Sequence, residues 1–431
     1  MREAGSSGAP SGDVLPTVLP PRVHGGYVMR LLFITWDGPG TTYHETLFIP
    51  LLERSIARGD KVLILQFSWD ADERGERLRD LASSKGMRFE HRRVHRGPAM
   101  WRLPFTMLAA LGWLVRKARD GTYDTILARS MIPGALALCM GVLTHGRSRF
   151  IFDADGLSAD ERVEFGGWPS GGVRYRVFRW IERAAVRRAD AVISRTSRAV
   201  SILRDRSGCP EEKFIVVTNG KDGEEFHPVS SARRAVIRDH LQLPEGAPLL
   251  VYVGSIGPQY EPGFMLQVLA RCLKREAQTH LLVLTSQRNH ATVGALVDHV
   301  MRDRVILHEA TPSQVPELLA SADAGLAFRR PTFSQRAVAP IKIAEYLLCG
   351  LPVAYTSGVG DLDQLLDDRV SIAVGSAEPA EAERVAEWFA TEVLEGRERF
   401  AEAAREVGLR RFSLDAGAEG YRRAFALARS R

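Results

Sequence analysis

Short runs of consecutive apolar residues alternate along this chain with segments in which apolar residues recur at helical spacing. One series of runs occupies residues 31–36, 61–65, 124–128, 149–152 and 191–194, and a second occupies residues 249–254, 281–285, 305–307, 324–328 and 351–356. Continuous apolar runs are typical of parallel strands that helices cover on both faces. The pattern therefore predicts an α/β protein with two doubly wound, Rossmann-like parallel sheets, whose ligands bind beyond the carboxyl ends of the strands.

The polar stretch 221–231 separates the two series, and a chain of 431 residues is too long for a single core. We expect a disordered tail over residues 1–28, an N-terminal domain over 29–228, a C-terminal domain over 229–412 and a final helix over 413–431 that returns toward the N-terminal domain. The tail is rich in Gly, Ser and Pro and lacks the layout of a signal peptide. Met29 directly precedes the first strand and is an alternative start of translation.

Composition narrows the class of protein only a little. The chain is 45% hydrophobic and 26% charged, and 58 Lys and Arg against 52 Asp and Glu give a net charge of +6. Arginines cluster in the first half and favour an anionic partner, but no stacking or groove-reading motif accompanies them, which disfavours nucleic acid. Four cysteines without C-x-x-C spacing indicate reduced thiols in a cytoplasmic protein, and no apolar run approaches the roughly 18 residues that span a bilayer.

The stretch 339–353 has the composition of an anion-binding device. Pro340 is tolerated in a first helical turn, whose free N–H groups then lie beside Lys342. Glu345 follows one turn later, and Gly350 and Pro352 end the helix before a new strand. The alternative is that Lys342 and Glu345 form only a surface ion pair at i,i+3 spacing.

Several short motifs of one enzyme family occur here in the family's order. They are Thr218-Asn219-Gly220 with Phe226-x-Pro228, Tyr252-x-Gly254-Ser255-x-Gly257, Val315-x-Glu317-Leu318-Leu319-Ala320-x-Ala322-Asp323, and Pro340-x-Lys342-x-x-Glu345-Tyr346-Leu347-x-x-Gly350-x-Pro352-Val353. The first half adds Phe152-x-x-x-Gly156-x-x-x-Asp160-Glu161 and Arg188-Ala189-Asp190-Ala191-Val192-Ile193. With these motifs the chain resembles retaining GT-B glycosyltransferases of family 4 (group 1), from the branch that assembles exopolysaccharide, capsule and lipid-linked glycans.

The resemblance implies a GT-B fold, in which two domains face each other across a cleft, and a reaction that needs no metal or other cofactor. The C-terminal domain would hold a nucleotide diphosphate-sugar donor, and the N-terminal domain would hold a glycan, lipid-linked or small-molecule acceptor. The anomeric configuration would be retained, with the leaving phosphate taking the acceptor proton. Two alternatives stay open: a catalytically weak GT-B binding partner in a glycan-assembly complex, and a GT-B sugar-nucleotide epimerase.

By the same resemblance, Glu345 would accept hydrogen bonds from the donor ribose and Lys342 would bind the diphosphate. The backbone around Pro340 and Ile341 would support the diphosphate, together with the loop that contains Gly254, Ser255, Gly257 and Gln259. This chain departs from the family in two places. Eight residues before Glu345 the family has a glutamate and this chain has Ala337, and Gln259 and Tyr260 stand where the family often has Arg and Lys.

The first half supplies further candidates. The loop 37–42 follows the first strand, and its Gly40 and Thr41 offer N–H and hydroxyl donors to the diphosphate or the acceptor. Arg129 ends a strand where the cleft is expected, and Asp155 follows another. We therefore take Lys342, Glu345, Arg129 and Asp155 as catalytic candidates. Asp153 and Asp155 also spell the D-x-D of metal-dependent transferases, but the GT-B interpretation predicts no metal.

The segment 101–119 is an apolar helix with arginines at both ends. A basic-edged apolar helix can lie in a membrane interface and bring an enzyme to a lipid-linked acceptor. The alternative is an ordinary helix of the first domain beside a protruding loop. We expect a cytoplasmic protein, with the inner face of the membrane as its place of contact.

Overall fold

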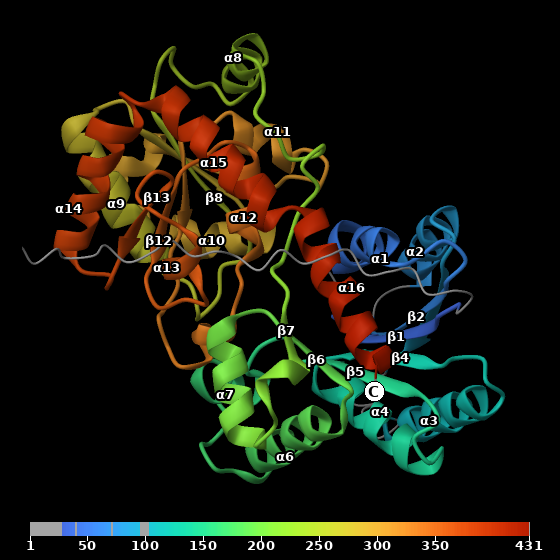
Figure 1. Ribbon diagram of the computed structural model, residues 1–431. Helices are drawn as coiled ribbons and strands as arrows, with labels where there is room; N and C mark the ends of the chain where they lie inside the picture. Colours follow the sequence, from blue (N-terminus) through green and yellow to red (C-terminus); the bar gives the residue numbers. More distant parts are fainter. Residues whose placement is uncertain (1–27, 39–40, 70–71, 95–102, 431) are drawn as a thin grey trace, which may run out of the picture.

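The computed structural model describes residues 28–38, 41–69, 72–94 and 103–430. The tail expected over residues 1–28 lies almost entirely outside the described residues. The apolar runs of the first half form a parallel sheet in the order β3-β2-β1-β4-β5-β6-β7 (Figure 1). Its strands are β1 (Arg30–Trp36), β2 (Lys61–Ser68), β3 (Arg88–Arg93), β4 (Thr125–Arg129), β5 (Arg149–Asp153), β6 (Ala191–Ser194) and β7 (Phe214–Val216).

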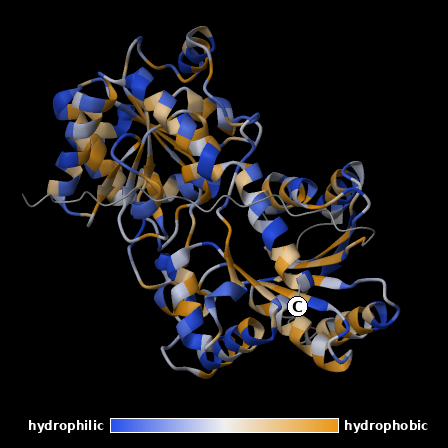
Figure 2. Cartoon of the chain, in the orientation of Figure 1, coloured by the Kyte–Doolittle hydropathy of each residue, from blue (hydrophilic) through white to orange (hydrophobic). Residues whose placement is uncertain are grey.

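The second half forms another parallel sheet in the order β10-β9-β8-β11-β12-β13. Its strands are β8 (Leu249–Val253), β9 (His280–Leu284), β10 (Val305–His308), β11 (Ala324–Ala327), β12 (Val353–Thr356) and β13 (Ser371–Val374). Every residue of β8, β9, β11 and β12 is buried, as the continuous apolar runs predict. Figure 2 shows the hydrophobic colour concentrated in the strands and a mixture of colours on the helices. The expected α/β class with two doubly wound sheets is confirmed.

Helices cover both faces of the first sheet, so its core has two layers. One layer packs against α3, α4, α6 and α7, and the other packs against α1, α2 and the last helix, α16. The bounds are η1 (His44–Phe48), α1 (Ile49–Ser55), α2 (Asp72–Ser84), α3 (Leu103–Arg119), α4 (Met131–Leu143), α5 (Ser158–Glu164), α6 (Val173–Arg188), α7 (Ser197–Ser207) and η3 (Glu211–Lys213).

The second sheet is covered in the same way, with α11, α12 and α15 on one face and α9 and α14 on the other. Its helices are α8 (Ser231–His240), α9 (Pro262–Arg275), η4 (Gln287–Asn289), α10 (His290–Gly294), η5 (His299–Arg304), α11 (Val315–Ala320), η6 (Ser334–Ala337), α12 (Ile341–Leu348), α13 (Leu362–Leu365), α14 (Pro379–Trp388), η7 (Phe389–Val393) and α15 (Arg397–Phe412). The last helix, α16 (Leu414–Ser430), follows them and packs on the first sheet. Among the residues that the structure describes, no helix is both long enough and apolar enough to cross a membrane.

The chain passes between the domains twice, and the two passes lie side by side. The backbone N–H of Lys221 donates to the carbonyl of Phe412 at 2.9 Å, and the N–H of Leu414 donates to the carbonyl of Lys221 at 2.8 Å. Gly220 permits this approach, because a Cβ atom there would lie 2.1 Å from the carbonyl oxygen of Ser413. After the second pass, α16 packs on the N-terminal domain (Figure 1). Its Tyr421 is buried in the core of that domain.

A second set of contacts joins the domains through α5 and α7. The carboxylate of Glu164, at the end of α5, accepts the hydroxyl of Thr332 at 2.6 Å and the N–H of Ser334 at 3.1 Å. The carboxylate of Asp361 accepts the N–H of Ser197 at 2.5 Å, in the first turn of α7. These contacts hold the loops around η6 and α13 against the N-terminal domain.

Candidate active site

Lys342 lies in the first turn of α12, where Pro340 is the N-cap and no side chain caps the free N–H groups. The side chain is buried, with 8% of the residue exposed. Its ammonium group lies 3.6 Å from the ring centroid of Tyr252 and 4.9 Å from that of Tyr260, yet it has no hydrogen-bond partner among the described residues. Burial, aided by the charge of Arg329, lowers the pKa of Lys342 well below its usual value.

Arg329 is a second buried cation beside Lys342. It follows β11, and its guanidinium lies 4.6 Å from the ring centroid of Tyr260 while its Nε donates to Oε1 of Gln335 at 2.6 Å. Within the described part of the chain, no carboxylate forms an ion pair with either Arg329 or Lys342. Tyr260 therefore contacts two buried cations whose charge no described protein group neutralises. The sequence analysis missed Arg329, although its position after the apolar run 324–328 was a signal.

The loop after β8 approaches Lys342 closely. Gly254 has a φ of 123°, and a Cβ atom at this position would lie 3.4 Å from the ammonium nitrogen of Lys342. The carbonyl of Ser255 accepts the hydroxyl of Tyr252 at 2.6 Å, and the carbonyl of Gln259 accepts the N–H of Arg330 at 3.0 Å. Gly257 leaves room for the Gln259 side chain, which a Cβ atom would approach to 2.9 Å. The structure thus brings this predicted loop and the α12 device together.

A cleft of about 310 Å³ opens beside this loop, between the two domains. Gly254, Ser255 and Glu345 line it from the second domain, and Thr42 and Thr46 line it from the first. Lys342 lies next to Gly254 but is not among the lining residues. The remaining lining residues are Lys221, Glu225, Phe226, Val253, Leu284, Thr285, Ser286, Arg288, Glu309, Ala310, Pro312 and Val315.

Glu345 is paired with Lys221 in the cleft, not with Lys342. Oε1 of Glu345 lies 3.0 Å from the ammonium nitrogen of Lys221, which also lies 5.1 Å from the ring centroid of Phe226. The alternative of a surface ion pair between Lys342 and Glu345 is therefore wrong. Lys221 escaped the sequence analysis because it lies in the polar stretch that was interpreted only as a domain boundary. Over the described ranges, no protein donor bonds the second carboxylate oxygen of Glu345.

Ala337 occupies the position where the family has a glutamate, and it faces the N-terminal domain. Its side chain is 1% exposed and belongs to the core of that domain. Its carbonyl oxygen would lie 3.6 Å from a Cβ atom on Gly156. Having alanine in place of the family's glutamate therefore also affects how the domains pack, because a glutamate side chain at position 337 would have to fit against the first domain.

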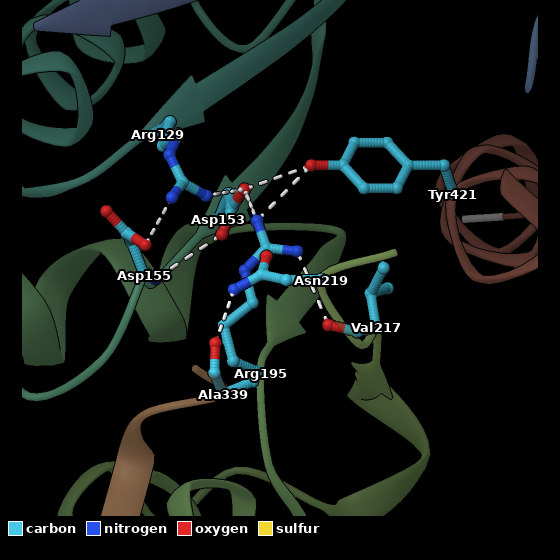
Figure 3. Close-up of polar contacts among 8 residues, drawn as sticks. All are labelled: Arg129, Asp153, Asp155, Arg195, Val217, Asn219, Ala339 and Tyr421. Atoms are coloured by element: carbon cyan, nitrogen blue, oxygen red, sulfur yellow. Dashed lines mark hydrogen bonds and ion pairs between the residues drawn. The ribbon is translucent and has the colours of Figure 1, made fainter. Parts of the chain in front are cut away.

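Arg129 and Asp155 belong to a polar network at the carboxyl ends of β4 and β5, in which Arg129 is buried and Asp155 is half-buried (Figure 3). One guanidinium nitrogen of Arg129 lies 2.9 Å from Oδ2 of Asp153, and the other bonds Asp155. Arg195 and the hydroxyl of Tyr421, the latter at 3.1 Å, also bond Oδ2 of Asp153. Burial raises the pKa of Asp153, but Arg195 and Arg129 outweigh it and hold this pKa below its usual value.

The first aspartate of the D-x-D sequence already has several protein partners. Oδ2 of Asp153 already accepts from two arginines and a tyrosine, which leaves it poorly placed to bind a cation. Over the described residues, no three His, Cys, Asp or Glu side chains form a metal-binding group. Arg195 and Tyr421 were missed by the sequence analysis, because nothing local in the sequence links them to Asp153.

Asp155 has the backbone of a left-handed residue, with a φ of 50°. Burial raises the pKa of Asp155 to about 6, against the opposing charge of Arg129. Tyr43 lies close by, and burial followed by the charge of Asp155 raises the pKa of Tyr43 to about 12. Neither Arg129 nor Asp155 lines the cleft described above. These two candidates therefore form a separate group on the N-terminal domain.

Of the loop 37–42, Gly40 lies outside the described residues. The hydroxyl of Thr41 donates to the carbonyl of Gly38 at 3.1 Å, whereas its neighbour Thr42 lines the cleft. His44 is fully buried, with Nε2 3.0 Å from the Thr35 hydroxyl and 3.2 Å from a carboxylate oxygen of Asp37. His44 therefore supports the loop through its contact with Asp37, the first residue of the loop.

Comparison with known proteins agrees with this geometry. Residues 50–220 match the model of the glycosyl transferase 4-like domain, and residues 247–390 match that of glycosyl transferases group 1. The chain is similar to an alpha-D-kanosaminyltransferase of Streptomyces kanamyceticus, 26% identical over 32% of this chain and 37% of the relative. It is also similar to a D-inositol 3-phosphate glycosyltransferase of Nocardia farcinica, 27% identical over 46% of this chain and 44% of the relative. Each match thus spans less than half the length of the relative.

Solved structures share the fold over nearly the whole chain. Anabaena HepE in complex with UDP-glucose superposes with a TM-score of 0.70 at 15% identity, and the match covers 92% of this chain and 99% of that chain. This likeness confirms the GT-B architecture expected from the sequence. With both halves matched to their family models in the expected order, the chain belongs to the group 1 (family 4) glycosyltransferases of the GT-B fold.

Proposed function

We propose that this protein transfers a sugar from a nucleotide diphosphate-sugar donor, held by the C-terminal domain, to an acceptor held by the N-terminal domain. The observation that carries the proposal is the buried ammonium of Lys342, which has no hydrogen-bond partner among the described residues. A buried cation without a partner is costly, and an anion that binds beside it recovers that cost. HepE, which shares the fold, was solved with UDP-glucose, and this supports a donor of the same class.

The diphosphate of the donor would lie at the Gly254 loop, beside the first turn of α12. There it would contact the free N–H groups of α12 and the ammonium of Lys342. Arg329, beyond the ring of Tyr260, would add a second positive charge. The open carboxylate oxygen of Glu345 would accept a hydrogen bond from the ribose, as the resemblance implies, with Lys221 holding the carboxylate in the cleft. The acceptor would be a glycan, a lipid-linked glycan or a small molecule.

In this proposal the reaction retains the anomeric configuration and uses no separate protein base. The bond between the anomeric carbon and the phosphate oxygen breaks, and the acceptor hydroxyl bonds to the same face of that carbon. The departing phosphate oxygen takes the proton of the hydroxyl. Lys342 and Arg329 stabilise the charge that develops on the diphosphate, which is the role a metal ion has in other transferases. Arg129 and Asp155 would orient the acceptor from the first domain.

The test is a thermal-shift panel of nucleoside diphosphates and nucleotide sugars, followed by turnover of the donor that stabilises the protein most. The wild type is compared with Lys342→Met and with the exposed control Lys274→Met from the last turn of α9. We expect stabilisation of the wild type and of the control but not of Lys342→Met. If no nucleotide stabilises the wild type, the donor site is wrong.

The comparisons do not favour the scaffold or epimerase alternatives.

Membrane contact through residues 101–119 stays a prediction. Residues 101 and 102 lie outside the described structure, and the rest of the segment forms α3. This helix exposes Phe105 and Leu108 to solvent, with 66% and 64% of each residue accessible. Its inner side packs in the core of the first domain through Leu114 and Ala118. The segment is thus a domain helix with an apolar outer edge.

A further inference from the structure

An apolar stripe runs along the outer side of α6. Val173, Val177 and Trp180 are 78%, 47% and 67% exposed, and their i, i+4, i+7 spacing places them on one side of the helix. The opposite side of α6 packs in the core through Ala185 and Val186. A single exposed apolar residue needs no explanation, but three in register on one helix, including a tryptophan, form a surface.

The same side of the molecule carries unneutralised positive charge. Arg174, Arg176 and Arg183 of α6 are exposed, and none of them has an ion-pair partner in the described ranges. The only acidic residue of α6 is Glu182, which is buried and bonded by Arg179. The exposed surface of α6 therefore offers arginine and apolar side chains without any carboxylate of its own.

The neighbouring helix extends this surface. α4 packs between α3 and α6, and Figure 1 shows all three helices along the same side of the N-terminal domain. At the end of α4, Val142 is 74% exposed and Leu143 is 44% exposed. Arg188 of α6 reaches the turn after α4, because a Cβ atom on Gly146 would lie 2.7 Å from its guanidinium. Apolar and basic groups thus continue from one helix to the next.

We propose that this surface, which we call the α6 face (Val173, Arg174, Arg176, Val177, Trp180 and Arg183), docks on a bilayer that contains anionic phospholipid. Helices that lie in a membrane interface combine Lys or Arg with Trp and aliphatic residues in this way. The positive charge complements anionic headgroups, and Trp180 has an apolar ring with one N–H donor, which suits the headgroup level. A protein partner would have to supply a matching acidic surface, whereas anionic lipid supplies the charge and the apolar layer together.

The inference goes beyond the proposed transfer reaction and does not rest on the donor site. Docking through the α6 face would hold the N-terminal domain, to which we assign the acceptor, next to the lipid. Vesicle binding is measured without nucleotide, so a failure here and a failure of the donor site are separate results.

The test begins with the full chain and two kinds of vesicle, one of phosphatidylcholine alone and one of phosphatidylcholine mixed with phosphatidylglycerol. We expect the protein to sediment only with vesicles that contain phosphatidylglycerol, and less so as salt is raised, because salt screens exposed charges. Failure to bind the anionic vesicles overturns the proposal, and so does equal binding to both kinds.

Variants then locate the contact. Changing Arg174, Arg176 and Arg183 together to Gln is expected to weaken binding about a hundredfold, at about fivefold for each arginine, and Trp180→Ser is expected to weaken it about tenfold. The matched control, Val300→Ser with Arg302→Gln, removes an exposed apolar and an exposed basic residue from the second domain and should bind as the wild type does. Wild-type binding by the α6 variants overturns the proposal.

Two further measurements distinguish lipid docking through the α6 face from contact through α3 and from self-association. Bromine-labelled lipid should quench tryptophan emission in the wild type and less in Trp180→Phe, a conservative change that leaves the fold intact. If Phe105→Ser with Leu108→Ser abolishes binding while the α6 variants bind normally, the contact is on α3 and the proposal is wrong. It is equally wrong if the wild type self-associates without lipid and Trp180→Ser abolishes that association, since the α6 face would then bind a second copy.

Discussion

Replacing Lys342 with Met should make the free protein more stable while it abolishes the response to nucleotide. Methionine keeps most of the apolar stem and removes the ammonium, which has no hydrogen-bond partner among the described residues. Burial and then Arg329 lower the pKa of Lys342, so the unfolded chain binds this proton more tightly than the folded chain does. Below the lowered pKa the folded protein carries the full cost of the charge, and the variant does not.

The size of the effect follows from two opposing contributions. Leaving a buried polar group unsatisfied costs about 1–3 kcal/mol, whereas the contact of the ammonium with an aromatic face returns roughly 0.5–2 kcal/mol. We therefore expect Lys342→Met to gain about 1 kcal/mol in free energy of unfolding. For a domain of this size, such a gain raises the melting temperature by about 2–4 °C.

The pH dependence of stability checks the sign of this effect separately. Stability of the wild type should rise as pH increases from the lowered pKa of Lys342 toward the unfolded value of about 10.4, because in that window the unfolded chain binds the extra proton. The variant should lack this rise. Its advantage should therefore be greatest below the lowered pKa of Lys342 and vanish as the pH approaches about 10.4.

The assay is thermal unfolding followed by circular dichroism, with and without the best nucleoside diphosphate, for the wild type, Lys342→Met and Lys274→Met. A ligand at a hundred times its Kd stabilises a protein by about 2.7 kcal/mol, and we expect this shift in the wild type and in Lys274→Met only. The reasoning would be refuted if Lys342→Met melts clearly below the wild type without nucleotide and still shows the full shift with nucleotide. Lys342 would then be a structural residue and the anion site would lie elsewhere.

Three further predictions concern the rest of the site. Glu345→Gln should lower the affinity for a nucleoside diphosphate about tenfold in calorimetry but leave the affinity for pyrophosphate unchanged; equal losses for both ligands would remove Glu345 from the ribose. Tyr421→Phe, which deletes a hydroxyl donor to Asp153, should cost about 1–2 kcal/mol in urea unfolding, and no loss would show that the two arginines satisfy Asp153 alone. Because burial raises the folded pKa of Asp155 to about 6, the wild type should lose stability as pH rises from about 4 to about 6. Asp155→Asn should flatten that loss in urea midpoints measured against pH, and an unchanged slope would contradict the assignment.

The sequence located the α12 device but could not show its partners outside the helix, and only the alternative of an ion pair within the helix is wrong. Spacing along a helix says which residues share a side, and i,i+3 neighbours such as Lys342 and Glu345 were candidates for a pair. In the fold, Lys342 lies against the Gly254 loop, whereas Glu345 lines the cleft and pairs with Lys221. Lys221 reaches it from the first crossing between the domains, which no local pattern encodes.

The same limit explains the other differences. Gln259 and Tyr260 stand where the family often has Arg and Lys, yet Arg329, which follows β11, places a cation against the ring of Tyr260. Asp153 was considered with Asp155 as a metal motif, yet its partners include Tyr421 on α16. The central strands were predictable because they are apolar and buried on both faces, whereas the edge strands β3, which is largely charged, and β13 were not predicted. The polar partners were not, because they are brought together only by the packing of separate elements.

The return of α16 to the first domain has a consequence for synthesis on the ribosome. Part of one face of the N-terminal sheet is covered by residues 414–430, which are translated after the whole of the C-terminal domain. Until they emerge, the apolar side chains that Tyr421 and Phe425 cover stay open to solvent, and Asp153 lacks one of its donors. The N-terminal domain is therefore translated first but completed last, and a chaperone that shields this face during translation would protect the chain from aggregation.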